Sequence, residues 1–234
     1  MPMPTTPRPT LRAAWTAAFR DAGLRRAMCA ACGALIPSLF GLSAFFAWLE
    51  DRPGYVLPDP LLDSLGPADV SVPIFTILYA TILVTLVRTL CEPGRVVRGL
   101  HAYAVLLWLR MGAMALVTLD PPLGFVPLAD AFTQLFYPGT EPFEKDLFFS
   151  GHTATLWLMA LIATTRAGHL WSGFASLTVG VLVVVQHAHY SIDVIALVSY
   201  DQVTYRDDNK WSLGYLTIVG AYVLKGSRHD VTRP

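Results

Sequence analysis

Residues Ala27 to Leu49 read AMCAACGALIPSLFGLSAFFAWL, a run of 23 residues without Asp, Glu, Lys or Arg. A helix of this length can cross the hydrocarbon core of a bilayer, which is roughly 30 Å thick. The run is too long for the core of a signal peptide, and no small-residue cleavage site follows it, so we interpret it as a retained membrane anchor. The sequence therefore predicts an integral membrane protein.

The composition agrees with this interpretation. Of the 234 residues, 54% are hydrophobic and 15% are charged, whereas a soluble domain usually carries about 25% charged residues. Lys plus Arg and Asp plus Glu balance at 17 each, so no net basic field indicates a nucleic-acid partner. The three cysteines form no disulfide ladder and no Cys/His zinc pattern, and we expect neither a metal nor a cofactor.

Further apolar stretches predict an all-α, polytopic bundle of six transmembrane helices. After the first span they are Val70 to Val87, Gly99 to Leu119, Leu147 to Thr165, Ala167 to about His187, and a stretch that begins near His189. We expect residues 1-26 to form a cytoplasmic N-terminal segment and residues 27-206 to form the membrane catalytic domain. Residues 207-234 form a tail, in which the 14 apolar residues of 211–224 suggest an interfacial or re-entrant helix.

The distribution of charge predicts the orientation. Ten arginines fall on one predicted side: Arg8, Arg12, Arg20, Arg25, Arg26, Arg88, Arg95, Arg98, Arg166 and Arg206. The segments 50–69 and 120–146 on the other side hold ten acids and only Arg52 and Lys145 as cations. The positive-inside rule therefore places the N-terminus in the cytoplasm and the acidic loops outside, in a plasma membrane or a bacterial inner membrane.

Two polar clusters lie at the ends of predicted spans. Residues 150–152 read SGH at the start of the fourth span, and residues 187–193 read HAHYSID between the fifth and sixth. His152 and His189 are 37 residues apart, which corresponds to one crossing and one return of about 27 Å each. We therefore expect both histidines at the same, outer face.

These residue types suit phosphoryl transfer. If the sixth helix begins near His189, Asp193 lies four residues on and on the same helix face, where its carboxylate can orient the imidazole. An imidazole held in this way can attack phosphorus, and His152 can protonate the leaving oxygen. The backbone N–H groups of Ser150, Gly151 and His152 at a helix start can hold a phosphate oxygen.

Two other interpretations of the histidines stay open. His152, His187, His189 and Asp193 are possible metal ligands by type, although no pair has a standard zinc spacing. The histidines could also be buried hydrogen-bond partners between the helices of a transporter or scaffold without enzymatic activity.

The motifs resemble those of the sphingomyelin synthase branch of the phosphatidic acid phosphatase type 2 superfamily, over roughly residues 57–198. Residues 146–153 read DLFFSGHT and resemble its Asp-x-x-x-Ser-Gly-His-Thr motif, and residues 187–194 read HAHYSIDV and resemble its His-x-His-Tyr-Thr-x-Asp-Val motif. Weaker matches are LPDPLLD at 57–63 and LRM at 109–111.

This resemblance implies a six-helix membrane enzyme with His152, His189 and Asp193 as its catalytic triad. Such an enzyme moves a phospho-headgroup from a glycerophospholipid to ceramide, and diacylglycerol leaves. The chain departs from the family at Ser191, where threonine is usual, and at Glu144 and Lys145, where cysteine and glycine commonly precede Asp146.

The charges near the motifs bear on the substrate. Phosphatases of the superfamily carry an arginine six residues before the second catalytic histidine, where this chain has Val183. A phosphodiester carries a single negative charge that Arg110 could hold, although Arg110 lies about 14 Å below the predicted helix end at Leu119 and could instead pair with an acid such as Asp201.

Asp146 could pair with the ammonium group of choline or ethanolamine, and Tyr190 could add a cation–π contact. We therefore predict phosphocholine or phosphoethanolamine as the headgroup and ceramide or a diacylglycerol-like alcohol as the acceptor. A lipid phosphate phosphatase that hydrolyses phosphatidic acid is the alternative enzyme.

Overall fold

The computed structural model describes residues 10–130, 143–147 and 150–194. Within these residues the regular secondary structure is helical, apart from one isolated bridge between Tyr55 and Leu119, and loops join the helices. The helices are α1 (Leu11–Arg20), α2 (Ala22–Glu50), α3 (Pro60–Asp63), α4 (Ser71–Thr89), α5 (Pro93–Leu116), α7 (Gly151–Ile162) and α8 (Arg166–Val185). This agrees with the predicted all-α class.

Four of these helices, α2, α4, α5 and α8, are long and apolar enough to cross a membrane. The fourth predicted span, Leu147 to Thr165, contains only the 12-residue helix α7, which is about 18 Å long and too short to cross alone. Apart from residues 191–194, which are helical, the sixth predicted span and the C-terminal tail with Asp201 lie outside the described residues. The predicted number of six spans therefore stays a prediction.

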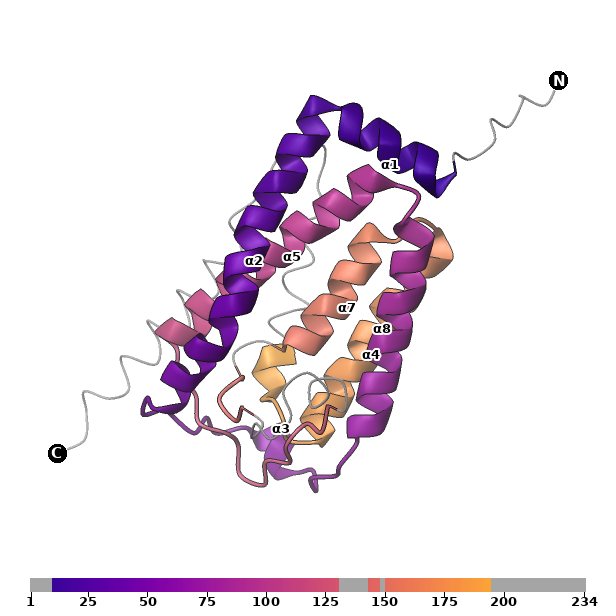
Figure 1. Cartoon of the computed structure of the whole chain (residues 1–234). Helices are drawn as coiled ribbons and strands as arrows, with labels where there is room; N and C mark the ends of the chain where they lie inside the picture. Colours follow the sequence, from indigo (N-terminus) through magenta and orange to yellow (C-terminus); the bar gives the residue numbers. More distant parts are fainter. Residues whose placement is uncertain (1–9, 131–142, 148–149, 195–234) are drawn as a thin grey trace.

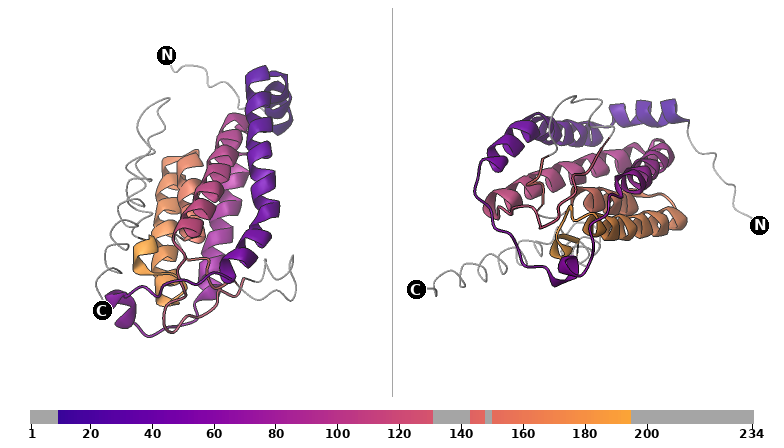
Figure 2. Two further views of the ribbon diagram at one scale, coloured as in Figure 1. Left: turned by 90° about the vertical axis from the view of Figure 1, so that its left-hand side faces the viewer. Right: turned by 90° about the horizontal axis from the view of Figure 1, so that it is seen from below.

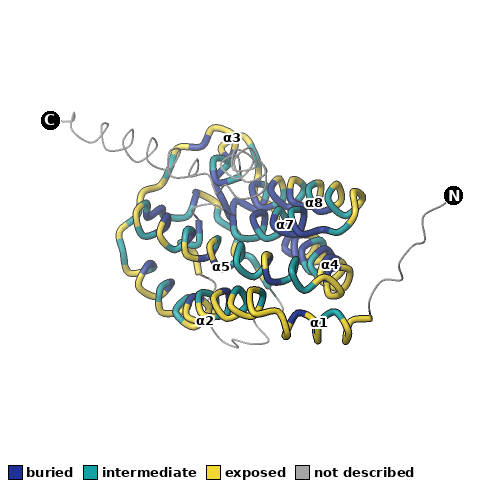
Figure 3. Tube along the Cα trace, turned by 90° about the horizontal axis from the view of Figure 1, so that it is seen from above, coloured by how far each residue is buried: buried dark blue, intermediate teal, exposed yellow. Residues whose placement is uncertain are grey.

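Helix α7 lies at the centre of the bundle. It packs against α4, α5 and α8, while α2 packs on the outer side of α5 and α1 lies across the end of the bundle where α2 begins (Figures 1 and 2). Figure 3 shows α7 largely buried and α2 largely exposed along its outer face. An apolar helix with an exposed outer face is expected where lipid is the solvent.

The chain after α8 folds back against α7 and α8. A Cβ atom at Gly180 of α8 would lie 2.7 Å from Cγ1 of Val194 and 3.3 Å from Cγ2 of Thr153, so glycine permits this close approach. The Ser176 hydroxyl of α8 donates to the Thr153 carbonyl at 2.8 Å. The start of α7 thus lies level with Ser176 and Gly180, below the end of α8 at Val185.

Polar side chains of the turn at 186–191 hold the loops at this end of the bundle. Gln186 is fully buried; its Oε1 accepts from the Val70 N–H at 3.1 Å and its Nε2 donates to the Ser71 hydroxyl at 2.8 Å. The Tyr190 hydroxyl accepts from the Leu57 N–H at 3.1 Å and donates to the Asp120 carbonyl at 2.8 Å. The loops before α4 and after α5 are therefore fixed to the chain that follows α8.

Asp59 forms a second anchor of the same kind. Its carboxylate caps α3 by accepting from the Leu61 and Leu62 N–H groups at 3.1 and 3.3 Å. It also accepts from the N–H of Ser191 at 2.7 Å and from the Ser191 hydroxyl at 2.9 Å. Burial opposes ionisation of Asp59, but these hydrogen bonds outweigh it and hold the pKa of the carboxyl below its usual value of 3.8.

We predict that Asp59→Ala lowers the free energy of unfolding by about 2 kcal/mol at pH 7, because it removes a helix cap and the contact with Ser191. Thermal unfolding of the detergent-solubilised protein measures this. Since the folded pKa is lowered, the stabilisation by the ionised carboxylate is present above the pKa of unfolded aspartate, about 3.9, and is lost as the pH falls through the folded pKa.

Asp59→Asn is the matched control, because the amide oxygen can still cap α3 but does not titrate. The stability difference between wild type and Asp59→Asn should shrink as the pH falls from 7 to 3. A difference that stays constant over this range would contradict the assignment.

Candidate active site

His189 lies in the turn between α8 and the helical residues 191–194. Its Nδ1 atom is 3.0 Å from the Leu147 carbonyl and 3.5 Å from Oδ2 of Asp193. The predicted pairing with Asp193 is therefore a close approach, but the predicted shared helix face is wrong, because His189 precedes the helix. The hydrogen-bond partner of the ring is the Leu147 carbonyl.

Asp193 holds the turn as well as the ring. Its Oδ2 accepts from the Tyr190 N–H at 3.1 Å, as an acidic side chain near the start of a helix often does. Its Oδ1 is buried and has no hydrogen-bond partner among the residues that the structure describes. The carboxylate thus holds the backbone directly after His189 and lies close to the His189 ring.

The contacts of His189 select one tautomer. A carbonyl oxygen can only accept, so we assign the proton to Nδ1, which donates to Leu147. In the neutral ring, Nε2 then carries a lone pair. An imidazole with a fixed Nδ1–H and a basic Nε2 is equipped to act as a nucleophile or a general base.

His152 is the second residue of α7, and its ring faces that of His189. The ring centroids are 6.4 Å apart and the planes are inclined by 65°. The ring of Phe75 on α4 meets His152 edge-on at 5.5 Å. Nδ1 of His152 is buried without a partner among the described residues, and such a buried polar atom indicates a group that binds there.

Arg110 reaches the start of α7 from α5. The side chain is buried with 7% of its surface exposed and forms an ion pair with Asp146. A Cβ atom at Gly151 would lie only 2.6 Å from Nη1 of Arg110, so the guanidinium lies directly against this glycine. The sequence left open whether Arg110 reaches the site. This contact shows that the guanidinium reaches the start of α7.

The described partner of Arg110 is thus Asp146, whereas Asp201, the partner weighed from the sequence, lies outside the described residues. Burial opposes ionisation of Asp146, but the attraction of Arg110 outweighs it and lowers the pKa of the carboxyl. Asp146 is therefore engaged with a cation of the protein itself, which leaves less of its charge for a substrate ammonium group.

The start of α7 is arranged as an anion site. Ser150 is the N-cap residue and is fully buried. Within the described part of the chain, the N–H groups of Gly151 and His152 have no acceptor. These donors, the positive end of the helix and the guanidinium of Arg110 converge beside the His152 ring, where they can bind a phosphate oxygen.

Two residues of the second motif point elsewhere. His187 has a φ of 55°, and its Nδ1 and Nε2 atoms lie 3.0 and 3.2 Å from the carbonyls of Leu123 and Leu65. Both of its nitrogens are thus engaged by loops, which disfavours the metal site that was weighed from the sequence. Tyr190 is fully buried with its hydroxyl engaged, and this placement disfavours the predicted contact with the substrate.

The sequence interpretation missed three supports of the site. These are the Leu147 carbonyl, which holds His189, and the side chains of Gln186 and Asp59, which fix the turn. The weak motif at 57–63 was the available signal for Asp59. No sequence motif identifies which backbone carbonyl will accept a hydrogen bond from a histidine, so the role of Leu147 could not be predicted.

Residues 145–204 match the family model described as PAP2 superfamily C-terminal. The matched range contains His152, His189 and Asp193, the three residues whose approach is described above. Neither a curated protein nor a solved structure matched the chain. The family match, on a chain with four helices long and apolar enough to cross a membrane among the described residues, supports the PAP2 superfamily, whose members are phosphatases or phosphotransferases.

Proposed function

We propose that this protein is a membrane-embedded lipid phosphotransferase, similar to sphingomyelin synthase. It moves phosphocholine or phosphoethanolamine from a glycerophospholipid to ceramide or a related lipid alcohol. The observation that supports this most is the approach of two imidazoles, 6.4 Å apart, beside a single guanidinium at a helix start. This arrangement supplies a nucleophile, a proton donor and an anion site.

The charge of the site favours a phosphodiester over a phosphomonoester. A phosphomonoester carries close to two negative charges at neutral pH, whereas a phosphodiester carries one. Asp146 already offsets much of the charge of Arg110. The two predicted outer cations have other partners: Lys145 pairs with Asp120 at 3.2 Å, and Arg52 donates to the Ala115 carbonyl at 2.6 Å.

The reaction that we propose has two steps. Nε2 of His189 attacks phosphorus, the bond from phosphorus to the diacylglycerol oxygen breaks, and His152 donates a proton to that oxygen. His152 then removes the proton from the acceptor hydroxyl, which attacks phosphorus, and the nitrogen–phosphorus bond to His189 breaks. Arg110 and the α7 N–H groups stabilise the negative charge on the phosphoryl oxygens in both steps.

The orientation of the protein is part of the proposal. We place the site at the outer face of a plasma membrane or bacterial inner membrane, with the N-terminus in the cytoplasm. The reason is that the arginine-rich segments lie at the ends of the predicted spans that are opposite to the two motifs. Both lipids would then enter sideways from the outer leaflet.

We predict ceramide-dependent headgroup transfer by the purified protein in liposomes that contain labelled phosphatidylcholine, phosphatidylethanolamine and phosphatidic acid. Without ceramide, the labelled phosphoryl group should accumulate on the protein. His189→Ala should abolish both signals, because it removes the attacking nitrogen; the expected loss of turnover is at least about 10³-fold. Product analysis and protein labelling measure the two effects.

His101→Ala is the matched control, because His101 lies in α5 and contacts the Val97 carbonyl of its own helix at 3.2 Å. This variant should retain transfer. Release of inorganic phosphate from phosphatidic acid alone would replace the transferase proposal by a phosphatase. Normal turnover in His189→Ala would exclude His189 as the nucleophile of either the transferase or the phosphatase.

We predict that Gly151→Ala lowers turnover by about 10² to 10³-fold, because the new methyl group displaces the Arg110 guanidinium from the phosphate site. The ion pair with Asp146 prevents a free readjustment of the arginine. Gly112→Ala is the control: this glycine is in α5, two residues after Arg110, and a Cβ atom there would meet nothing within 4 Å. Equal activities of the two variants would contradict the role of Arg110.

A further inference from the structure

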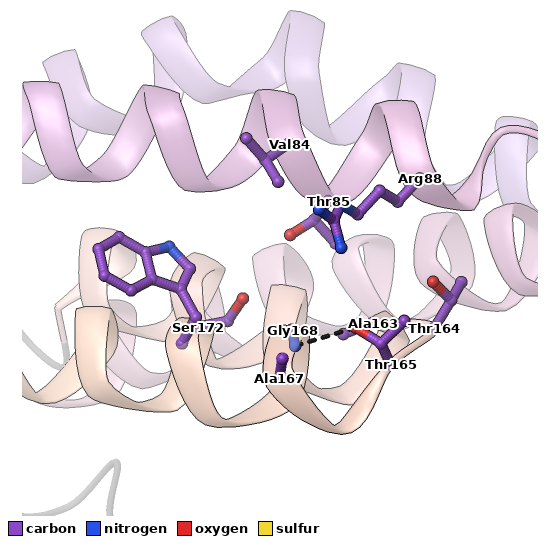
Figure 4. A pocket seen from close by; sticks show the side chains of 10 residues that line it. Val84, Thr85, Arg88, Ala163, Thr164, Thr165, Ala167, Gly168 and Ser172 are labelled. Carbon is purple, nitrogen blue, oxygen red and sulfur yellow. Dashed lines mark hydrogen bonds between the residues drawn. The ribbon is translucent and has the colours of Figure 1, made fainter.

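A cavity of about 190 Å³ lies between α4 and α8, at the end of α7 opposite the paired imidazoles (Figure 4). Its wall at Ala163 is eleven residues from His152, or about 16 Å along a helix. Thr85 and Arg88 of α4 face Thr165 and Ser172 across the space. The proposed reaction uses none of these residues.

Ser172 contributes a buried hydroxyl to this cavity. Its surface is only 1% exposed, and its Oγ atom has no hydrogen-bond partner within the described ranges. A serine in a helix can donate to the carbonyl four residues earlier, but this one does not. A buried hydroxyl that lacks a partner is costly and indicates a group that is bound there.

The opening of the cavity is positively charged. Arg88 lies in the last turn of α4, is exposed, and forms no hydrogen bond or ion pair with the residues described. On the other side, Thr165 caps the 20-residue helix α8 by accepting from the Gly168 N–H at 3.1 Å. The positive end of α8 therefore points to the same opening as the guanidinium.

Among the described residues that line the cavity, no acid offsets this charge. The described residues that line it include neither Asp nor Glu. The nearby Glu92 pairs with Arg95 at 2.6 Å, and Arg95 also donates to the Ala163 carbonyl at 3.1 Å, which fixes the loop between α7 and α8. The cavity thus combines a cation, a positive helix end and a free hydroxyl.

We infer that this cavity binds a phosphate group, as a second site independent of the proposed function. Arg88 contacts its oxygens and the Ser172 hydroxyl donates to one of them, while the positive end of α8 at the opening adds a favourable field. Charge-assisted hydrogen bonds of this type are the strong ones. The site takes either the headgroup of a membrane phospholipid or free phosphate.

The surroundings favour the phospholipid as the source. The volume is below the range of roughly 300 to 1,000 Å³ that is usual for whole small-molecule ligands, so it accommodates a headgroup and leaves the acyl chains outside. Apolar side chains of α4 and α8 that are close in sequence to the lining residues are exposed: Leu83 by 64%, Leu170 by 67% and Phe174 by 63%. Trp171, whose Nε1 donates to the Thr81 hydroxyl at 3.2 Å, is of the type found at membrane interfaces.

The test measures the thermal unfolding midpoint of the full-length protein in detergent, titrated separately with phosphatidylglycerol, phosphatidylcholine and inorganic phosphate. Phosphatidylglycerol should raise the midpoint of the wild type, and Arg88→Gln should weaken this response about tenfold in concentration. Arg98→Gln is the matched control, because it removes an exposed arginine of α5 that does not line the cavity.

Ser172→Ala separates binding from a purely structural role. The variant should respond more weakly to the ligand, while its midpoint without ligand stays unchanged or rises, since the hydroxyl has no partner to lose. An equal response to inorganic phosphate that depends on Arg88 supports the site and assigns free phosphate as its ligand.

The inference is overturned if neither phosphatidylglycerol nor inorganic phosphate raises the unfolding midpoint of the wild type. It is also overturned if Arg88→Gln and Arg98→Gln respond equally to the ligand. A lower midpoint of Ser172→Ala without ligand, together with an unchanged ligand response, would also overturn it. Because the readout is binding, its outcome does not depend on whether headgroup transfer is observed.

Discussion

The turn at residues 186–191 supplies the hydrogen bonds on which the loops at this end of the molecule depend. Irregular backbone buried at the end of a membrane bundle needs a partner for each polar group, because the surroundings supply little water. Gln186 binds the start of α4, and His187 lies between the carbonyls of Leu65 and Leu123. Since His189 lies in the same turn, the loops that cover the bundle and the imidazole at its centre belong to one hydrogen-bond network.

This network has a consequence for folding. Asp59 binds Ser191, and Tyr190 binds Leu57, so contacts across more than 130 positions in sequence fix the two residues that follow His189. The position of the ring therefore depends on loop contacts as well as on helix packing. Loop substitutions far from the imidazoles in sequence can therefore change the site without changing the bundle.

The sequence predicted the end of the bundle at which the histidines meet. The count of residues between His152 and His189 is compatible with a hairpin, and α7 and α8 form one. The prediction failed on local geometry, because it placed His189 and Asp193 on one face of a helix that begins near His189, whereas the helical residues begin at 191. The ring is held instead by the Leu147 carbonyl, and residue types carry no information about backbone acceptors.

The depth of Arg110 shows how helix lengths decide the chemistry. The sequence pattern continued the third span to Leu119, whereas α5 ends at Leu116 and α7 begins only at Gly151. Both differences bring the guanidinium and the start of α7 to a common level. Burial of a guanidinium at this depth is costly without an acid, and Asp146, four residues before Ser150, supplies one. The ion pair thus explains why an arginine is tolerated in the middle of an apolar helix.

The short α7 also bears on the choice between transfer and hydrolysis. Thr153 lies level with Ser176 and Gly180, while α8 continues to Val185. The paired imidazoles are therefore recessed below the end of α8, and His189 is only 1% exposed. Phe75 borders the His152 ring with an apolar edge. A recessed site with an apolar wall restricts water and strengthens the electrostatic contacts within it, so a lipid hydroxyl that enters from the side gains an advantage over water as the acceptor.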